Sequence, residues 1–187
     1  MSSQINWSEP QQHEFILQCS VKEFCKEKKI IKRISIANKL YFVNSGVLGI
    51  YFNLNEIERK LWNIALPYTF TTAWPSFLMN LPNKLEIIAL KDTVCVEIPI
   101  TALQWLYENV AEGDKFGTLL YQNQIIIADS RFLIQKETSL QKKYENLLKI
   151  YPNINKHVNK KVISNLLDVS QEHFTREYKK WYHSSKK

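Results

Sequence analysis

The sequence predicts an α+β protein, in which a β-roll is followed by one long helix and a helix-turn-helix. Between Lys29 and Glu97, short runs of β-branched and aromatic residues are separated by turn residues, a pattern typical of a small all-β roll. From Asp114 to Lys136, apolar residues recur at three- and four-residue steps, which predicts a long helix. From Lys160 to Trp181, two helical patterns flank a short break. We therefore expect three parts, over residues 1–113, 114–137 and 138–187.

Two local patterns set expectations for the first part. Residues 11–25 place Phe15, Ile16 and Cys19 at helical spacing, so a short amphipathic helix is expected ahead of the roll. Asn44-Ser45-Gly46 separates two strand-like runs and predicts a hairpin, because glycine supplies the positive φ of a tight turn. The sequence contains only four glycines, so other turns must use residues with less conformational freedom.

The predicted long helix carries a seam that resembles a coiled coil, and the helix would be about 34 Å long. A seam of this length favours a homodimer, and a polar asparagine within it could fix the register. Alternatively, the helix packs half-buried on its own β-roll. The seam residues expected at the dimer interface are Phe116, Leu120, Asn123, Ile127 and Ile134.

The stretch from Lys160 to Trp181 predicts two helices around a tight turn. Ser170 is a good N-cap for the second helix, because its hydroxyl can accept from an orphan backbone N–H. The inner face of this helix carries Phe174, Tyr178 and Trp181, and its other face is polar and basic. Such a helix can enter the DNA major groove, or it can be half of an ordinary helical hairpin with a solvated face. The candidate DNA-binding residues are Ser170, Gln171, Glu172, His173, Thr175, Arg176, Lys179 and Lys180.

Charge is unevenly distributed along the chain. Residues 1–134 contain 13 Lys and Arg and 13 Asp and Glu, whereas residues 135–187 contain 12 and 5. The net charge of +7 therefore lies in the last 53 residues, which include the predicted helix-turn-helix. A cationic segment of this kind is typical of a protein that binds a polyanion. The alternative is a solvated lysine-rich surface.

Taken together, the order of these parts resembles the Crp/Fnr family of transcriptional regulators, particularly its divergent Bacteroidetes-type members. LYFVNSGVLGIYF, from Leu40 to Phe52, is similar to the hairpin of the family's cyclic-nucleotide-binding-like jelly roll. Residues 143–181 are similar to the family's passage into the recognition helix. Within them, Ser170-Gln171-Glu172-x-x-x-Arg176 matches the family's recognition pattern.

This resemblance implies a homodimer that binds a pseudo-palindromic operator in double-stranded DNA, with RNA polymerase as a further expected partner. By position, Glu172 and Arg176 would read base edges. A carboxylate can accept from cytosine N4–H, and an arginine can donate to both guanine O6 and N7. Gln171 would contact adenine or a phosphate. Only Tyr182 to Lys187 follow the predicted helix, so we expect a helix-turn-helix that lacks a full wing.

The stretch from Leu66 to Leu85 departs from the family members that bind cyclic AMP. It contains no Gly, Glu or Arg, so a cyclic phosphate would lack its guanidinium partner and a glycine-rich backbone. We expect no response to cyclic AMP, and the sequence does not name another small-molecule effector. Its apolar residues either fill the core, which we prefer, or form a pocket for an apolar ligand. The candidate pocket residues are Tyr68, Phe70, Trp74, Phe77 and Lys84.

Other classes of function find little support. Three cysteines cannot supply the usual four thiolates of an iron–sulfur cluster, and the four histidines show no metal-site spacing, so no cofactor and no metal are expected. No nucleophile–base pattern or phosphate-binding loop indicates an enzyme. With no signal-peptide pattern and no apolar run of about 20 residues, a cytoplasmic location without a membrane span is expected. The alternative function is a ligand-binding or scaffolding protein with a degenerate helix-turn-helix.

Overall fold

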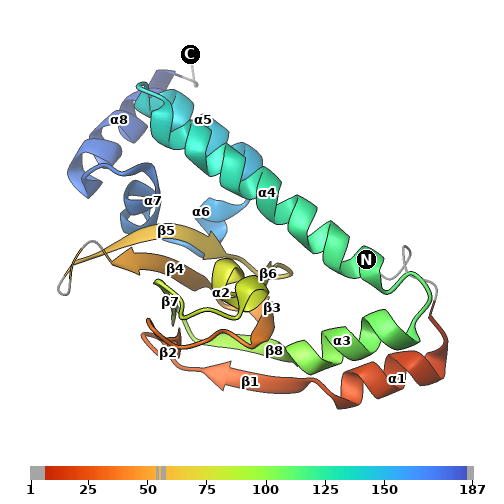
Figure 1. Ribbon diagram of the computed structural model, residues 1–187. Helices are drawn as coiled ribbons and strands as arrows, with labels where there is room; N and C mark the ends of the chain where they lie inside the picture. Colours follow the sequence, from red (N-terminus) through yellow and green to blue (C-terminus); the bar gives the residue numbers. More distant parts are fainter. Residues whose placement is uncertain (1–6, 54, 56–57, 185–187) are drawn as a thin grey trace. The chain divides into compact units, whose positions relative to one another are not determined.

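The computed structural model describes residues 7–53, 55 and 58–184. The chain separates into two compact units, residues 1–122 and residues 123–187, and each is described by itself. One long helix, α4 (Asp114–Lys136), contributes its first part to unit 1 and the remainder to unit 2. The predicted fold class is confirmed: a β-roll precedes a long helix and a set of C-terminal helices (Figure 1).

Unit 1 is built mainly from eight strands in two antiparallel four-stranded sheets. The sheet orders are β1-β8-β3-β6 and β2-β7-β4-β5. Helices α1 and α3 lie side by side at one end of the roll (Figure 1). The elements are α1 (Glu9–Leu17), β1 (Ser20–Phe24), β2 (Lys29–Ile31), β3 (Lys39–Ser45), β4 (Leu48–Asn53), β5 (Arg59–Ala65), β6 (Phe70–Thr71), α2 (Trp74–Met79), β7 (Leu85–Ala89), β8 (Thr93–Pro99) and α3 (Ile100–Asn109).

The core of unit 1 lies between the two sheets. In β3, Leu40 is paired with Ile98 of β8, and both side chains are buried. In the other sheet, Ile50 of β4 is paired with Ile87 of β7, and these are buried too. Burying such aliphatic side chains stabilises the fold by about 1.5–3 kcal/mol each relative to leaving them exposed. The two sheets are therefore held together mainly by apolar contact.

The predicted helix over residues 11–25 is only half correct. Helix α1 begins at a capping box in which the Gln11 N–H donates to Ser8 Oγ and the Ser8 N–H donates to Gln11 Oε1, and it ends at Leu17. Residues 20–24 form strand β1 instead, in register with β8 from Ser20 opposite Glu97 to Phe24 opposite Thr93. Backbone hydrogen bonds to β8 make this segment a strand. The spacing of residues within the segment gives no information about such a distant partner.

The hairpin predicted at Asn44-Ser45-Gly46 is also wrong. A turn does occur there, and Gly46 has a φ of +86° as expected. However, β3 pairs with β6 and β8, whereas β4 pairs with β5 and β7. The turn therefore carries the chain from one sheet to the other. The Val47 N–H donates to Thr93 Oγ1 at 3.1 Å, which ties this crossing to the start of β8.

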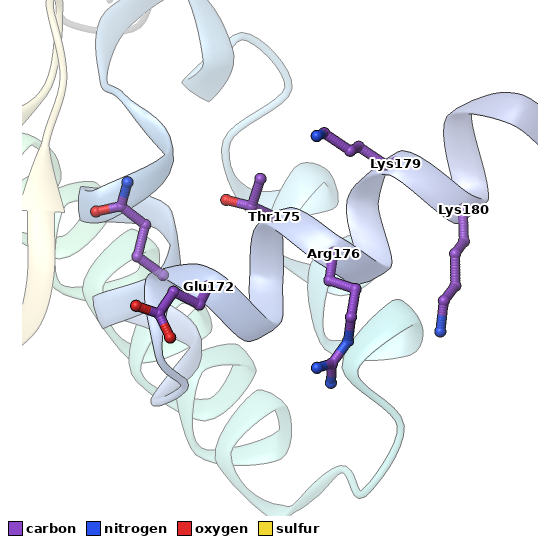
Figure 2. A pocket seen from close by; sticks show the side chains of 6 residues that line it. Glu172, Thr175, Arg176, Lys179 and Lys180 are labelled. Carbon is purple, nitrogen blue, oxygen red and sulfur yellow. The ribbon is translucent and has the colours of Figure 1, made fainter.

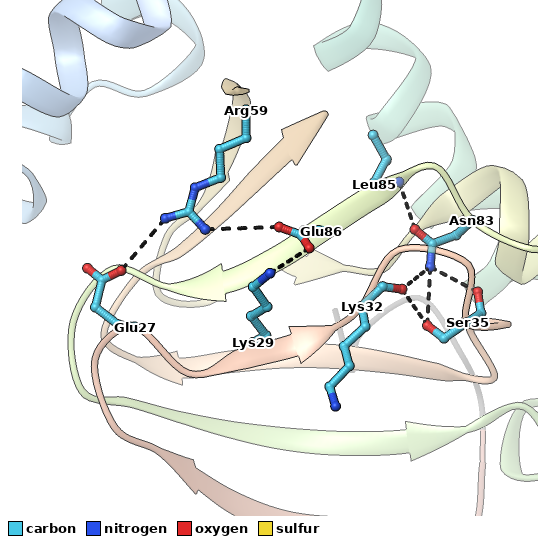
Figure 3. A network of polar contacts seen from close by, with 8 residues as sticks. All are labelled: Glu27, Lys29, Lys32, Ser35, Arg59, Asn83, Leu85 and Glu86. Atoms are coloured by element: carbon cyan, nitrogen blue, oxygen red, sulfur yellow. Dashed lines mark hydrogen bonds and ion pairs between the residues drawn. The ribbon is translucent and has the colours of Figure 1, made fainter. Parts of the chain in front are cut away.

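Polar side chains fix the surface of the roll around β7 (Figure 3). The mostly buried carboxylate of Glu86 accepts from Lys29 Nζ at 2.8 Å and faces Arg59 Nη1 at 4.0 Å. The side-chain amide of Asn83 donates to the Lys32 carbonyl at 2.6 Å and to the Ser35 carbonyl at 2.9 Å. Each network satisfies buried polar groups, as a stable fold requires. We assign both a structural role.

Unit 2 contains the second part of α4 and four further helices. They are α5 (Leu140–Ile150), α6 (Ile154–His157), α7 (Lys160–Leu167) and α8 (Gln171–Ser184). The short helix α6 was not predicted. Helices α7 and α8 occupy the positions expected for the helix-turn-helix, and α8 continues as helix to Ser184.

Candidate nucleic-acid interface

The turn between α7 and α8 is fixed by backbone geometry. Asp168 adopts the left-handed conformation with a φ of 60°, and its N–H donates to the Asn165 carbonyl at 3.2 Å. The Val169 N–H donates to the Ser164 carbonyl at 3.1 Å. Ser170 then caps α8, because the His173 N–H donates to Ser170 Oγ at 3.1 Å. These bonds satisfy groups that both helix ends would otherwise leave without partners.

A buried arginine completes the end of α7. The side chain of Arg131, on α4, has 0% exposure, and its Nη2 donates to the Leu166 carbonyl at 2.7 Å. Burial lowers the pKa of Arg131 from its usual value, with Tyr151 acting in the opposite direction. The sequence pattern missed this residue, because arginine is rarely fully buried. The carbonyl end of α7 is thereby tied to the long helix.

Aromatic contacts set the rotation of α8. Phe174 is fully buried, and its ring lies 5.4 Å from that of Tyr144 on α5. The ring of Tyr178 makes an edge contact with that of Tyr144, with 5.7 Å between the ring centres. The ring of Trp181 stacks on that of Tyr144, with 6.0 Å between the ring centres. The three inner-face residues predicted from the sequence are therefore brought together on one aromatic side chain. Because they face inward, the opposite side of α8 must face outward.

The outward side of α8 borders a surface hollow of about 560 Å³. Six of the eight candidate DNA-binding residues line it. Of the other two, Ser170 serves as the N-cap and His173 is exposed elsewhere on the helix. Figure 2 shows Arg176 and Lys180 extending to the same side of α8, with Lys179 on the other. The lining residues are Gln171, Glu172, Thr175, Arg176, Lys179 and Lys180.

The electrostatics of this face combine three cations with two carboxylates. The first carboxylate is Glu172. The second, Glu177, was not among the candidates, although it precedes Lys180 by three residues, a spacing that predicts an ion pair on a helix. It accepts from Lys180 Nζ at 2.9 Å and from Arg176 Nε at 3.3 Å. Two hydrogen bonds lower the pKa of Glu177, and the one from Lys180 has a larger effect than the one from Arg176. Chemically, this face offers many N–H donors to an anionic ligand.

The candidate pocket residues of unit 1 divide between core and surface. Phe77 is buried, Trp74 contacts the rings of Phe77 and Tyr121, and Phe70 contacts the ring of Phe116 at 5.4 Å. By contrast, Tyr68 and Lys84 are exposed. This arrangement favours the core interpretation for the three inner aromatic residues.

The predicted seam of α4 faces largely inward in the single chain. Leu120 is 4% exposed and Ile134 is 1% exposed, while Asn123 is exposed and Phe116 and Ile127 are half-buried. A different set of apolar side chains projects into solvent from α4. This exposed stripe consists of Ile125, Ile126, Phe132 and Leu133, at 57–64% exposure. The assignment of the seam to a dimer interface stays a prediction.

Among the described residues, no group of three or more His, Cys, Asp or Glu side chains could hold a metal ion. In the same part of the chain, no helix has both the length and the apolar character that crossing a membrane requires.

Comparisons with known proteins agree with this architecture. Residues 21–110 match the family model of the cyclic nucleotide-binding domain. FixK2 from Bradyrhizobium japonicum is similar with a TM-score of 0.74 at 13% identity, covering 89% of this chain and 86% of that one. A protein from Eubacterium rectale, described as of the Crp/Fnr family, gives 0.69 at 17% identity, covering 95% and 85%. CLP from Xanthomonas campestris, a c-di-GMP responsive global regulator, gives 0.63 at 13% identity, covering 95% and 93%.

The match over residues 21–110 covers most of the roll, which is thus similar to the cyclic nucleotide-binding domain. No curated protein sequence matches the chain. The structural likeness, which extends over most of the chain, gives it the fold of the Crp/Fnr-type regulators. The resemblance drawn from the sequence is thus confirmed at the level of the fold.

Proposed function

We propose that this chain is a transcription regulator of the Crp/Fnr type that binds double-stranded DNA with the outer face of α8. The observation that carries the proposal is the placement of Glu172 and Arg176 on one exposed face, beside Lys179 and Lys180. A carboxylate and a guanidinium can each read a base edge, and ammonium groups suit phosphates. This function needs no catalytic group, and it places the chain in the cytoplasm with its DNA.

The proposal includes a homodimer on a pseudo-palindromic operator, with RNA polymerase as a further partner. Two-fold symmetry would set the two α8 helices about 34 Å apart, in successive major grooves. The exposed stripe of α4 supports dimerisation, since four large apolar side chains on one helix face are costly to leave in water. The partly buried seam is a second candidate for the same interface. The two faces are distinguished by mutation below.

Arg176→Ala tests the reading function of α8. We expect the binding free energy for the operator to weaken by about 1–3 kcal/mol, because a bidentate contact with guanine is removed. Binding to random DNA should change little. Lys179→Ala should instead weaken both DNAs alike and lower the salt slope by about one counterion, as the loss of a phosphate contact does. The operator is first recovered by selection from a random library, and affinities are then measured by fluorescence anisotropy.

The contrast between these two variants is the control, because any basic surface would pass a simple binding assay. Equal weakening of operator and random DNA by Arg176→Ala would mean that α8 holds DNA without reading it. If neither substitution matters, the alternative of a ligand-binding or scaffolding protein with a degenerate helix-turn-helix is favoured.

Cyclic AMP should not bind to the roll. The stretch from Leu66 to Leu85 lacks the arginine and glycine that would hold a cyclic phosphate, and Lys84 is exposed at its end. A ligand at 100 times its Kd stabilises a fold by about 2.7 kcal/mol, which a thermal-shift assay detects easily. The Tm should stay constant up to millimolar cyclic AMP, and a saturable rise would contradict this proposal.

A further inference from the structure

Arg176 and Lys180 extend to one side of α8 (Figure 2). The carboxylate of Glu177, on the same helix, contacts both of these cations. Its side chain is 22% exposed, compared with 67% for Arg176 and 64% for Lys180. It accepts from both, at 3.3 Å from Arg176 Nε and at 2.9 Å from Lys180 Nζ. One carboxylate therefore holds two of the three cations of the proposed interface.

This arrangement contributes little to folding, because ion pairs at an exposed surface are worth little in stability. Its effect on a polyanion is larger. A carboxylate within a few ångströms of two cations lies well inside the Debye length of about 8–10 Å, so it offsets part of the attraction for phosphates. A phosphate that approaches Lys180 or the Arg176 Nε must therefore compete with Glu177 for these donors.

The contact with Nε also orients the guanidinium. Because the Glu177 contact uses Nε, the two terminal nitrogens of Arg176 can still donate to a ligand bound at this face of α8. Those two donors match guanine O6 and N7, the commonest specific contact in the major groove. Guanine is neutral and leaves the Glu177 contact in place, whereas a phosphate brought close to both cations is also repelled by the adjacent carboxylate.

We propose that Glu177 is a specificity-determining residue that restrains Arg176 and Lys180 from phosphate contacts on random DNA while leaving Arg176 oriented for a base. This inference rests on the proposed DNA-binding function and assigns a role to a residue outside the recognition pattern. It predicts that Glu177 raises the ratio of operator to random-DNA affinity. It does so mainly by weakening the random complex.

The test is Glu177→Gln in the full-length protein, titrated against the selected operator and a scrambled duplex over a range of salt concentrations. We expect random-DNA affinity to rise about fivefold or more, with the salt slope steeper by about one counterion. Operator affinity should rise by a smaller factor, so the ratio falls. In the double variant Glu177→Gln/Lys180→Gln, random-DNA affinity should return toward the wild-type value.

Glu145→Gln is the matched control. Glu145 is exposed on α5 in the same unit and accepts only from Gln141 among the hydrogen bonds described for it. Its substitution therefore makes the same change in net charge without removing a contact of Arg176 or Lys180. If the two glutamine variants affect random DNA equally, the effect is one of net charge and the inference is overturned. If the wild-type protein shows no preference for any DNA sequence, the proposed function fails, and this inference fails with it.

Discussion

Replacing Ile126 with lysine should dissociate the proposed homodimer and weaken operator binding about 100-fold or more. Ile126 is 64% exposed in the single chain and belongs to the exposed stripe of α4. In a dimer through this face, the new ammonium group would lose water without gaining a partner, which costs several kcal/mol. The loss occurs twice in a symmetric interface. A monomer would hold only one half-site and lose the gain in avidity from linked binding.

Light scattering gives the mass of the particle, and anisotropy gives the affinity for the operator. Ile16→Lys is a matched control, because Ile16 on α1 is also 64% exposed but lies far from α4 in the sequence. Its mass should equal that of the wild type. Ile127→Lys distinguishes the two faces of α4. If it dissociates the dimer and Ile126→Lys does not, the interface is the seam predicted from the sequence; a monomeric wild type would refute both.

Replacing Arg131 with alanine should destabilise unit 2 by about 3–5 kcal/mol. The side chain is large and fully buried, so its removal leaves a cavity of the kind that costs 2–5 kcal/mol in protein cores. The Leu166 carbonyl also loses its donor at 2.7 Å, and a buried acceptor without a partner costs about 1–3 kcal/mol. Relief of the desolvated charge offsets part of this sum. The opening free energy of α7 and α8 amides, measured by native-state hydrogen exchange, should fall accordingly.

Arg131→Met separates the two contributions. Methionine restores most of the buried volume but no donor, so this variant should lose about 1–3 kcal/mol. Arg33→Ala, at an exposed arginine of unit 1, should change α7 exchange by less than about 0.5 kcal/mol. Equal exchange in the wild type and the alanine variant would show that Arg131 is not part of the structural support of α7.

Helix α8 was predictable because its signals are local. Ser170 marks its start through a hydrogen bond to a backbone group three residues away, and Phe174 and Tyr178 mark its inner face by their spacing. Once the start and the inner face are known, the outer face follows from helical geometry. That is why six of the eight candidate DNA-binding residues line one hollow.

The errors occur where distant partners decide the structure. Ser20–Phe24 becomes a strand because it pairs with β8. The two strands around Gly46 enter different sheets because β3 pairs with β8 and β4 pairs with β7. The long helix has apolar residues on two faces, and spacing alone cannot show that Leu120 and Ile134 are the ones already covered. Arg131 was missed because its burial depends on α7, some 35 residues later in the chain.

The residues in the turns of this chain also affect the conformational entropy of its unfolded state. Six described residues other than glycine adopt a positive φ, including the β-branched Ile34 and the turn residue Asp168. Each such conformation costs about 1–3 kcal/mol of strain in the native chain. A side chain at the same position, however, leaves the unfolded chain fewer backbone conformations than glycine would, so less entropy is lost when the turn forms. The scarcity of glycine thus moves part of the cost of each turn from the disorder of the denatured ensemble to the geometry of the folded protein.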